Sequence, residues 1–315
     1  MVEPGDSKPC KAAMDSTKRF RENIPSVVDE LAGTCGQEGF FDHVGAEPIP
    51  SREAVREIIS RMFRVLYPGY FVSQCLDATN LRYYLGQEIT EIFELLSDQI
   101  TLAIRHECVR HGLPCSHCAE RGQEEAVRFL GQLPQLRARL AKDIRAAYNG
   151  DPAAQGFDDI IFSYPGLFAL TVYRMAHELY LSKVPLLPRI MTEYAHGRTG
   201  IDINPGARIG ESFFMDHGTG IVIGETADIG DNVRIYQGVT LGALSLSLEE
   251  VQNLRSQKRH PTIEDDVIIY ANATILGGDT VIGARSIIGG SVWLTHSIPP
   301  DTRVFLKPEQ VFLNG

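Results

Sequence analysis

A six-residue spacing of aliphatic side chains runs through the C-terminal part of the chain and limits what it can fold into. The aliphatic residues recur six positions apart in four blocks: Ile203, Ile209, Met215; Ile223, Ile229, Ile235, Leu241; Ile263, Ile269, Ile275; Ile282, Ile288, Leu294. An α-helix turns by about 600° over six residues, so it would place successive members on different sides. A coil of three short strands points all of them inward. The spacing therefore predicts stacked coils around one continuous aliphatic core.

The residues between these positions are those that tight turns require. Glycine often follows the aliphatic residue, as in Ile209-Gly210, Ile223-Gly224 and Ile288-Gly289. Glycine accepts the unusual backbone angles of such turns. Residues 199–298 are therefore predicted to form a parallel β-helix, with a C-terminal tail over residues 299–315.

The chain before this segment follows a helical pattern. Residues 51–198 carry apolar side chains three and four positions apart, as amphipathic helices do. Ser51 can cap the first of them, and we expect helices over residues 51–66, 80–109, 124–148, 166–181 and 185–194. Residues 1–50 lack any sustained period and are predicted to be a loosely ordered leader. The expected fold class is α+β, an all-helical N-terminal domain followed by a β-helix.

Two interruptions of the six-residue pattern place histidines in loops. Two extra residues lie in the stretch Asp216–Gly220, which contains His217. A long excursion over residues 243–262 contains His260. Loops that leave a rigid scaffold are common places for binding and catalytic groups. Both loops are therefore candidate functional segments.

Charge and composition argue against several classes of protein. Acidic residues outnumber basic residues 40 to 30, which gives a net charge of −10. Proteins that bind nucleic acid carry the opposite balance, so no nucleic-acid partner is expected. No apolar stretch reaches the roughly 20 residues of a membrane helix, and the N-terminal residues lack an apolar signal core. The six cysteines then indicate reduced thiols in a cytoplasmic protein rather than a disulfide framework.

Three strings in the repeat segment match a known family. They are Ile201-Asp202-Ile203-Asn204-Pro205, the stretch from Met215 to Thr226, and Arg259-His260-Pro261. Through them the chain resembles serine O-acetyltransferases, over residues 140 to 300 or so. The resemblance implies a left-handed β-helix and transfer of an acetyl group from acetyl-CoA to the hydroxyl of L-serine. It also implies a place in cysteine biosynthesis.

Acetyl transfer needs a base beside the acceptor hydroxyl. A neutral imidazole suits this role near neutral pH, and His217 lies in a glycine-rich loop that can present it. Asp202 lies nearly one coil earlier, so it can stack beside His217, orient the imidazole and stabilise its protonated form. The family's catalytic pair, carried to the matching positions, is His217 with Asp202.

The resemblance also assigns the two charged ends of serine. It implies that Asp151 and Asp216 hold the ammonium group, and that Arg259 and His260 engage the carboxylate. Arginine is well suited to two-point binding of a carboxylate. L-Cysteine differs from serine by one atom, so we expect it to occupy the same place as a feedback inhibitor.

The same resemblance extends to the co-substrate and to partners. The family binds acetyl-CoA in a groove between neighbouring coils, and Gly242, Ala243 and Ala271 match that groove. No catalytic metal is expected. The flat faces of the coils and family active sites between subunits predict a homotrimer, or a dimer of trimers. The last residues, Val311–Gly315, lack the terminal isoleucine through which many relatives dock into cysteine synthase, which argues against that complex.

A separate group of cysteines lies in the helical half. Cys108, Cys115 and Cys118 are close in sequence, and the two-residue gap between Cys115 and Cys118 is a metal-ligand spacing. A metal bound there would be structural. The alternative is a set of free thiols in a corner between two helices.

Three other functions remain open at this point. The nearest is a hexapeptide O-acetyltransferase that acts on a sugar or antibiotic hydroxyl. A zinc-dependent trimeric hydratase would need three histidine ligands, for which this half offers only His217, His260 and His296. A non-catalytic scaffold would use the β-helix only to form trimers.

Overall fold

The computed structural model describes residues 18–37, 41–44, 49–244 and 257–307. Contacts divide the chain into two compact units, Met1–Pro48 and Ile49–Gly315. The first unit contains α2 (Ile24–Ala32), a helix that the sequence did not lead us to expect. Its proline lies in the first turn, where a missing N–H breaks no helical bond. None of its side chains is buried.

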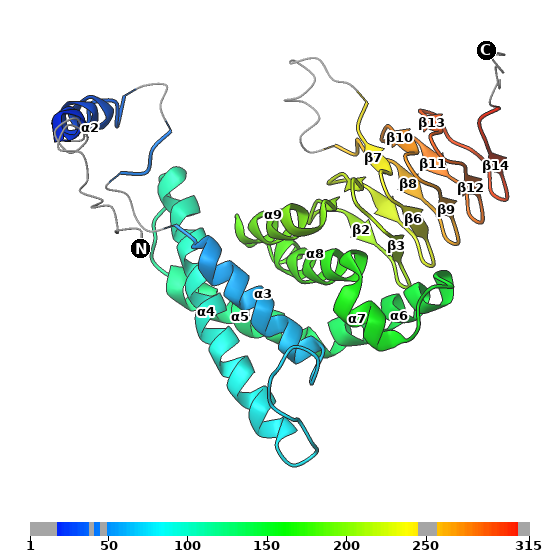
Figure 1. Cartoon of the computed structure of the whole chain (residues 1–315), viewed down its shortest axis with the longest axis horizontal. Coiled ribbons are helices and arrows are strands. Elements are labelled where there is room, and N and C mark those ends of the chain that lie inside the picture. The colour runs from blue at the N-terminus through cyan, green and yellow to red at the C-terminus, as the bar shows by residue number, and fades with distance from the viewer. Residues whose placement is uncertain (1–17, 38–40, 45–48, 245–256, 308–315) are drawn as a thin grey trace, which may run out of the picture. The chain divides into compact units, whose positions relative to one another are not determined.

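Seven described helices form the N-terminal half of the second unit (Figure 1): α3 (Arg52–Leu66), α4 (Leu81–Arg110), α5 (Cys118–Gly131), α6 (Leu133–Gly150), α7 (Phe157–Ser163), α8 (Pro165–Leu181) and α9 (Leu187–Thr199). The Ser51 hydroxyl accepts a hydrogen bond from the Ala54 N–H at 3.3 Å, which confirms the predicted cap of α3. The single helix expected over residues 124–148 is wrong. Pro134 lacks the N–H that would continue α5, so α6 begins as a new helix at Leu133. Within the described residues, no helix has the length and apolar character needed to cross a bilayer.

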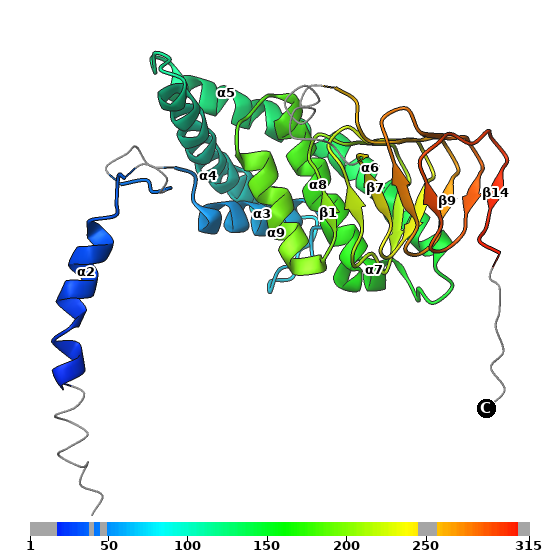
Figure 2. The same ribbon diagram turned by 90° about the horizontal axis from the view of Figure 1, so that it is seen from above.

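The C-terminal half is a parallel β-solenoid. Its strands are β1 (Asp202–Ile203), β2 (Arg208–Ile209), β3 (Phe214–Asp216), β4 (Val222–Ile223), β5 (Asp228–Ile229), β6 (Arg234–Tyr236), β7 (Thr240–Gly242), β8 (Thr262–Ile263), β9 (Ile268–Ile269), β10 (Thr274–Leu276), β11 (Val281–Ile282), β12 (Ile287–Ile288), β13 (Trp293–Leu294) and β14 (Arg303–Val304). They stack into three sheets, β1-β4-β7-β10-β13, β2-β5-β8-β11 and β3-β6-β9-β12-β14 (Figure 2). The chain visits the three sides in turn, which confirms the predicted fold class.

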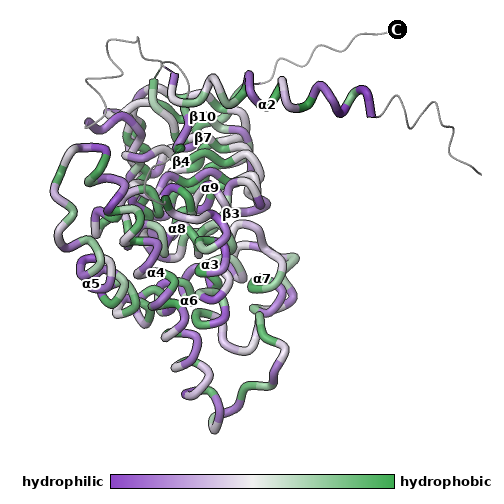
Figure 3. The backbone as a smooth tube through the Cα atoms, turned by 90° about the vertical axis from the view of Figure 1, so that its left-hand side faces the viewer, coloured by the Kyte–Doolittle hydropathy of each residue, from purple (hydrophilic) through white to green (hydrophobic). Residues whose placement is uncertain are grey.

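The six-residue pattern fills the inside of the solenoid. None of its thirteen aliphatic side chains is more than 7% exposed, and hydrophobic stretches recur from coil to coil around β4, β7 and β10 (Figure 3).

The strand register shows where the six-residue pattern is interrupted. Val222 pairs with Thr240, eighteen positions later, whereas Thr240 pairs with Thr274 across the excursion. Residues 245–256 of that excursion and 308–315 of the tail lie outside the described residues.

Helix α8 joins the helical half to the solenoid because it belongs to two hydrophobic cores. Ala169, Leu170 and Tyr173 pack with the aliphatic residues of the coils, whereas its other face, including Met175 and Leu179, packs with the remaining helices. The Tyr173 hydroxyl also donates to the carbonyl of Ala207 at 2.6 Å. The start of the solenoid is thereby closed by a helix.

A buried ion pair fastens this junction. Arg174 of α8 and Asp143 of α6 are each 1% exposed and form two hydrogen bonds of 2.7 and 2.8 Å. Arg174 also donates to the carbonyls of Ile209 and Gly210, while Asp143 accepts from the Phe213 N–H at 3.1 Å. The pair therefore satisfies backbone groups of the first coil that have no strand beneath them.

We predict that Arg174→Met strongly destabilises the protein. The substitution leaves the Asp143 carboxylate buried without its counter-ion, which typically costs about 3–5 kcal/mol of unfolding free energy. Denaturant unfolding at neutral pH measures the loss. Replacing both residues, in Asp143→Leu/Arg174→Met, should recover part of it because no lone charge remains.

The matched control is the ion pair Arg285–Asp301. It has the same two-bond geometry, at 2.8 and 2.7 Å, but its side chains are 56% and 64% exposed. Water screens such a pair, so Arg285→Met should leave the unfolding midpoint nearly unchanged. Equal losses in the two variants would contradict the role given to burial.

Candidate active site

One group of candidate residues gathers where the chain passes from β3 to β4. Asp216 ends β3, and His217 follows with a φ of +55°, continued by Gly218 and Gly220 at +87° and +84°. The His217 side chain is 75% exposed, and its Nε2 lies 3.8 Å from Oδ1 of Asp216. The φ of Gly218 lies in the region that favours glycine, and a Cβ there would also lie 2.6 Å from the end of the Ile201 side chain in the preceding coil.

Asp151 reaches the same place from the end of α6. Its carboxylate accepts hydrogen bonds from the Tyr164 hydroxyl at 2.5 Å and from the Ala153 N–H at 2.8 Å. The Tyr164 hydrogen bond lowers the pKa of Asp151, and the charge of His217 acts in the same direction. Burial raises the pKa of Asp216, and the charge of Asp151 adds to that rise. We call Asp151, Asp216 and His217, with Tyr164, the His217 corner.

The structure places Asp202 beside this corner but with another partner. Asp202 lies on β1, directly after Ile201, and its carboxylate accepts a hydrogen bond from Nη1 of Arg189 at 3.1 Å. Arg189 also pairs with Glu193 one turn further along α9. Among the described residues, no hydrogen bond joins Asp202 to His217. The residues brought together with His217 are Asp216 and Asp151, so the expected pair of His217 with Asp202 stays a prediction.

A second group lies where the chain passes from the first sheet to the second. Arg259 and His260 stand just before β8 and meet Thr226, which follows β4. The Thr226 hydroxyl accepts from the backbone N–H groups of Arg259 at 2.9 Å and of His260 at 3.1 Å. The Arg259 guanidinium forms an ion pair with Glu225. We call Glu225, Thr226, Arg259 and His260 the His260 corner.

His260 is held as a neutral hydrogen-bond donor. The Thr226 N–H points at its Nδ1 at 3.1 Å, and the Thr226 hydroxyl lies 2.9 Å from the same nitrogen. Because Nδ1 accepts, the proton of the neutral ring resides on Nε2. Burial and the charge of Arg259 lower the pKa of His260 to about 4. The ring packs against Gly224, where any Cβ would overlap it.

The two corners lie at opposite ends of the same side of the coil. The His217 corner precedes β4, whereas the His260 corner follows it. The residues matched to acetyl-CoA are divided in the same way. Gly242 ends β7 and Ala243 follows it, and this end of β7 stacks over the end of β4 through the hydrogen bond from the Gly224 N–H to the Leu241 carbonyl. Ala271 lies between β9 and β10, above the His217 corner.

Several residues of these corners escaped the sequence analysis. Glu225 and Thr226 lie inside the string from Met215 to Thr226, and Tyr164 lies within the wider span of the resemblance. Their contacts, however, are with residues distant in sequence. Gln237 is a further one, because its Oε1 is buried without a hydrogen-bond partner among the described residues. It sits between β6 and β7, on the same edge as the His217 corner.

The low pKa of His260 predicts how stability depends on pH. Between pH 6.5 and 4 the unfolded chain binds a proton at this histidine and the folded chain does not, so acidification through this window destabilises the fold. His260→Asn keeps an acceptor for the Thr226 N–H but cannot take up that proton. Its unfolding midpoint in urea should fall less than that of the wild type between pH 7 and pH 5.

The control for this measurement is His296→Asn, which changes an exposed histidine outside both corners. This variant should show the wild-type loss of stability over the same pH range. A wild-type loss in His260→Asn as well would show that other groups cause it.

Comparison with known proteins identifies the family. No family model matches the chain. A serine acetyltransferase of Synechococcus elongatus is 48% identical over 268 residues, which cover 84% of this chain and 83% of the relative. The crystal structure of serine acetyltransferase isoform 3 from Entamoeba histolytica, in complex with cysteine, superposes with a TM-score of 0.69 at 33% identity, covering 85% and 86% of the two chains. The soybean enzyme complexed with serine gives a TM-score of 0.52 at 28% identity, covering 82% and 98%.

These similarities reach beyond the strings that suggested the family. An alignment of 268 residues must include much of the helical half, whereas the resemblance drawn from motifs began only at residue 140. The match in sequence and the match in fold therefore agree over most of the chain. By both measures, this chain belongs to the serine acetyltransferase family of acyltransferases.

Proposed function

We propose that this chain transfers the acetyl group of acetyl-CoA to the hydroxyl of L-serine and releases O-acetylserine and CoA. One observation carries the proposal, namely the charges and donors of the two corners. The His217 corner holds two carboxylates and an exposed imidazole, and the His260 corner holds an arginine and a neutral histidine. An amino acid has two charged ends that match these groups. Relatives whose crystal structures contain serine and cysteine support this choice of ligand.

The exposed imidazole of His217 is the proposed general base. It takes the proton of the serine hydroxyl as the oxygen attacks the thioester carbonyl, and it returns a proton to the departing CoA sulfur. The negative charge of Asp216, 3.8 Å away, stabilises the imidazolium that forms between these steps. Asp202 on β1 is the partner that the family resemblance assigns to this imidazole, and it would exchange its bond to Arg189 for His217.

The charged ends of serine are assigned to opposite corners. Asp151 and Asp216 hold the ammonium group; Asp151 is suited to this because Tyr164 keeps it ionised. Arg259 and the Nε2–H of His260 bind the carboxylate, with Arg259 exchanging its bond to Glu225 for the ligand. A neutral histidine supplies a donor there without a second positive charge to compete with Arg259.

We propose that the site is completed between two chains of a homotrimer. A single amino acid cannot span one whole side of a coil, yet the two corners of one chain lie at opposite ends of it. Three coils packed around a threefold axis place the His217 corner of one chain beside the His260 corner of the next. The groove for acetyl-CoA, with Ala271 on one corner and Gly242 and Ala243 on the other, is divided in the same way.

Mixed trimers test the base and the shared site together. We expect His217→Ala and Arg259→Ala each to lower kcat/KM for serine, the former by about 10²–10⁴-fold. When the two variants are co-expressed with different affinity tags and purified through both, each mixed trimer contains one intact site. Release of CoA with L-serine should then recover to about one third of the wild-type rate per trimer.

The control pairs two variants from the same corner. Mixed trimers of His217→Ala and Asp216→Ala contain no intact His217 corner, so their rate should stay at that of the better parent. If the first mixture also fails to recover while both parents fold, the site lies within one chain. Activity with sugar hydroxyls but not with serine would instead overturn the choice of acceptor.

The same site should bind L-cysteine as a competitor of serine. Cysteine has the same ammonium and carboxylate, so the Arg259→Ala substitution should weaken both ligands together, each by roughly 1.5–3 kcal/mol if a charge-assisted hydrogen bond is lost. Steady-state kinetics give the serine KM and the cysteine inhibition constant in one experiment. A rise in KM with unchanged inhibition would place cysteine at a different site.

A further inference from the structure

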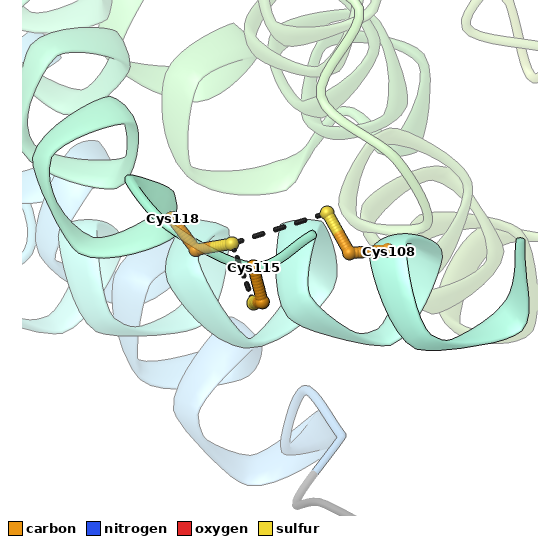
Figure 4. A group of neighbouring side chains, drawn as sticks. All are labelled: Cys108, Cys115 and Cys118. Atoms are coloured by element: carbon orange, nitrogen blue, oxygen red, sulfur yellow. Dashed lines mark hydrogen bonds between the residues drawn. The ribbon is translucent and has the colours of Figure 1, made fainter. Parts of the chain in front are cut away.

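Three cysteine sulfurs converge where α4 meets α5 (Figure 4). Cys108 lies in the last turn of α4, Cys115 in the connecting turn, and Cys118 is the first residue of α5. The Sγ atoms of Cys115 and Cys118 are 2.7 Å apart, those of Cys108 and Cys118 are 3.9 Å apart, and all three lie within 4.8 Å of one another. The cysteines are free thiols.

The backbone conformation at the end of α4 brings these three cysteines together. The Leu113 N–H donates to the Cys108 carbonyl at 2.8 Å, and Gly112 adopts a φ of +63°, so the chain reverses tightly at the end of α4. The reversal returns Cys115 and Cys118 to the side of the helix that carries Cys108. Cys108 and Cys118 are buried and Cys115 is exposed, which leaves a path from solvent to the cluster.

We propose that Cys108, Cys115 and Cys118 bind a thiophilic d¹⁰ metal ion, with Zn²⁺ as the ion that fits best. Zinc–sulfur bonds of about 2.3 Å in a tetrahedral site place two sulfurs about 3.8 Å apart. The Cys108–Cys118 separation of 3.9 Å already meets this condition. Cys115 must move outward by about 1 Å to do the same, and its place in an exposed turn allows that movement.

The site offers three protein ligands and leaves the fourth position to water. Two of the neighbouring histidines pair with carboxylates instead: His111 with Glu107 at 3.0 Å and His117 with Glu120 at 3.2 Å. Among the described residues, the group that meets in this place consists of the three sulfurs alone. A bound ion would tie the end of α4 to the start of α5. It shares no residue with the two corners of the acyl-transfer site, so its effect falls on stability and not on the chemical step.

Metal binding by the full-length chain tests the proposal. Protein purified under reducing, metal-free conditions is mixed with Zn²⁺, desalted and measured for metal content. We expect about one zinc per chain in the wild type and in the control Cys75→Ser, because Cys75 is exposed and lies outside the cluster. Cys108→Ser and Cys115→Ser should each bind zinc at least about tenfold more weakly. Zinc should raise the thermal midpoint of the first two proteins only.

Two further measurements distinguish the ions and guard against misfolding. Bound Co²⁺ should give the absorption spectrum of a tetrahedral thiolate site. Tight binding of Cu⁺ that displaces zinc would identify Cu⁺ as the ion that the three cysteines bind. Because Cys115 is exposed, Cys115→Ser tests the site even if Cys108→Ser does not fold. Zinc retention in Cys115→Ser, absence of zinc from the wild type, or a Cys115–Cys118 disulfide in its place would overturn the proposal.

Discussion

The ion pair between Arg174 and Asp143 is the contact on which the two halves of this structure depend. A stack of coils has an open end whose backbone N–H and C=O groups lack a neighbouring strand, and such an edge is costly when it is buried. Arg174 and Asp143 satisfy these groups at Ile209, Gly210 and Phe213 while neutralising each other. The charges are thus tolerated in the interior because each has several partners.

The same junction also positions part of the proposed active site. Asp143 lies on α6, which ends beside Asp151, and α8 begins directly after Tyr164. Two glycines let these helix ends approach β3: a Cβ on Gly150 would lie 2.7 Å from the Phe214 ring, and one on Gly166 would lie 2.6 Å from the Met215 carbonyl. The helical half therefore supplies the Asp151 carboxylate of the proposed site, whereas the solenoid supplies Asp216.

Hydrophobic periodicity was sufficient to predict the architecture, because a six-residue repeat has few ways to bury its aliphatic side chains. Hydrophobic periodicity was insufficient where the structure depends on a single backbone N–H or a single polar side chain. The break between α5 and α6 rests on the missing N–H of Pro134 inside an otherwise helical pattern, and the pairing of Asp202 with Arg189 joins residues of different elements. The candidate residues of the site came from matching strings. Their division between two corners became visible only when the order of strands around the coil was known.

The strand register across the long excursion has a consequence for how this scaffold can change. Leu241 stacks on Ile275, and Ile229 on Ile263, as though nothing had been inserted between the coils. The excursion leaves and returns at a corner, so its length does not alter the registration of the core. The entropy of closing such a loop grows only logarithmically, by about 0.6 kcal/mol for each doubling of its length. Variants of this protein can therefore lengthen, shorten or replace that segment, and with it the surroundings of the groove proposed for acetyl-CoA, while the aliphatic column stays as it is.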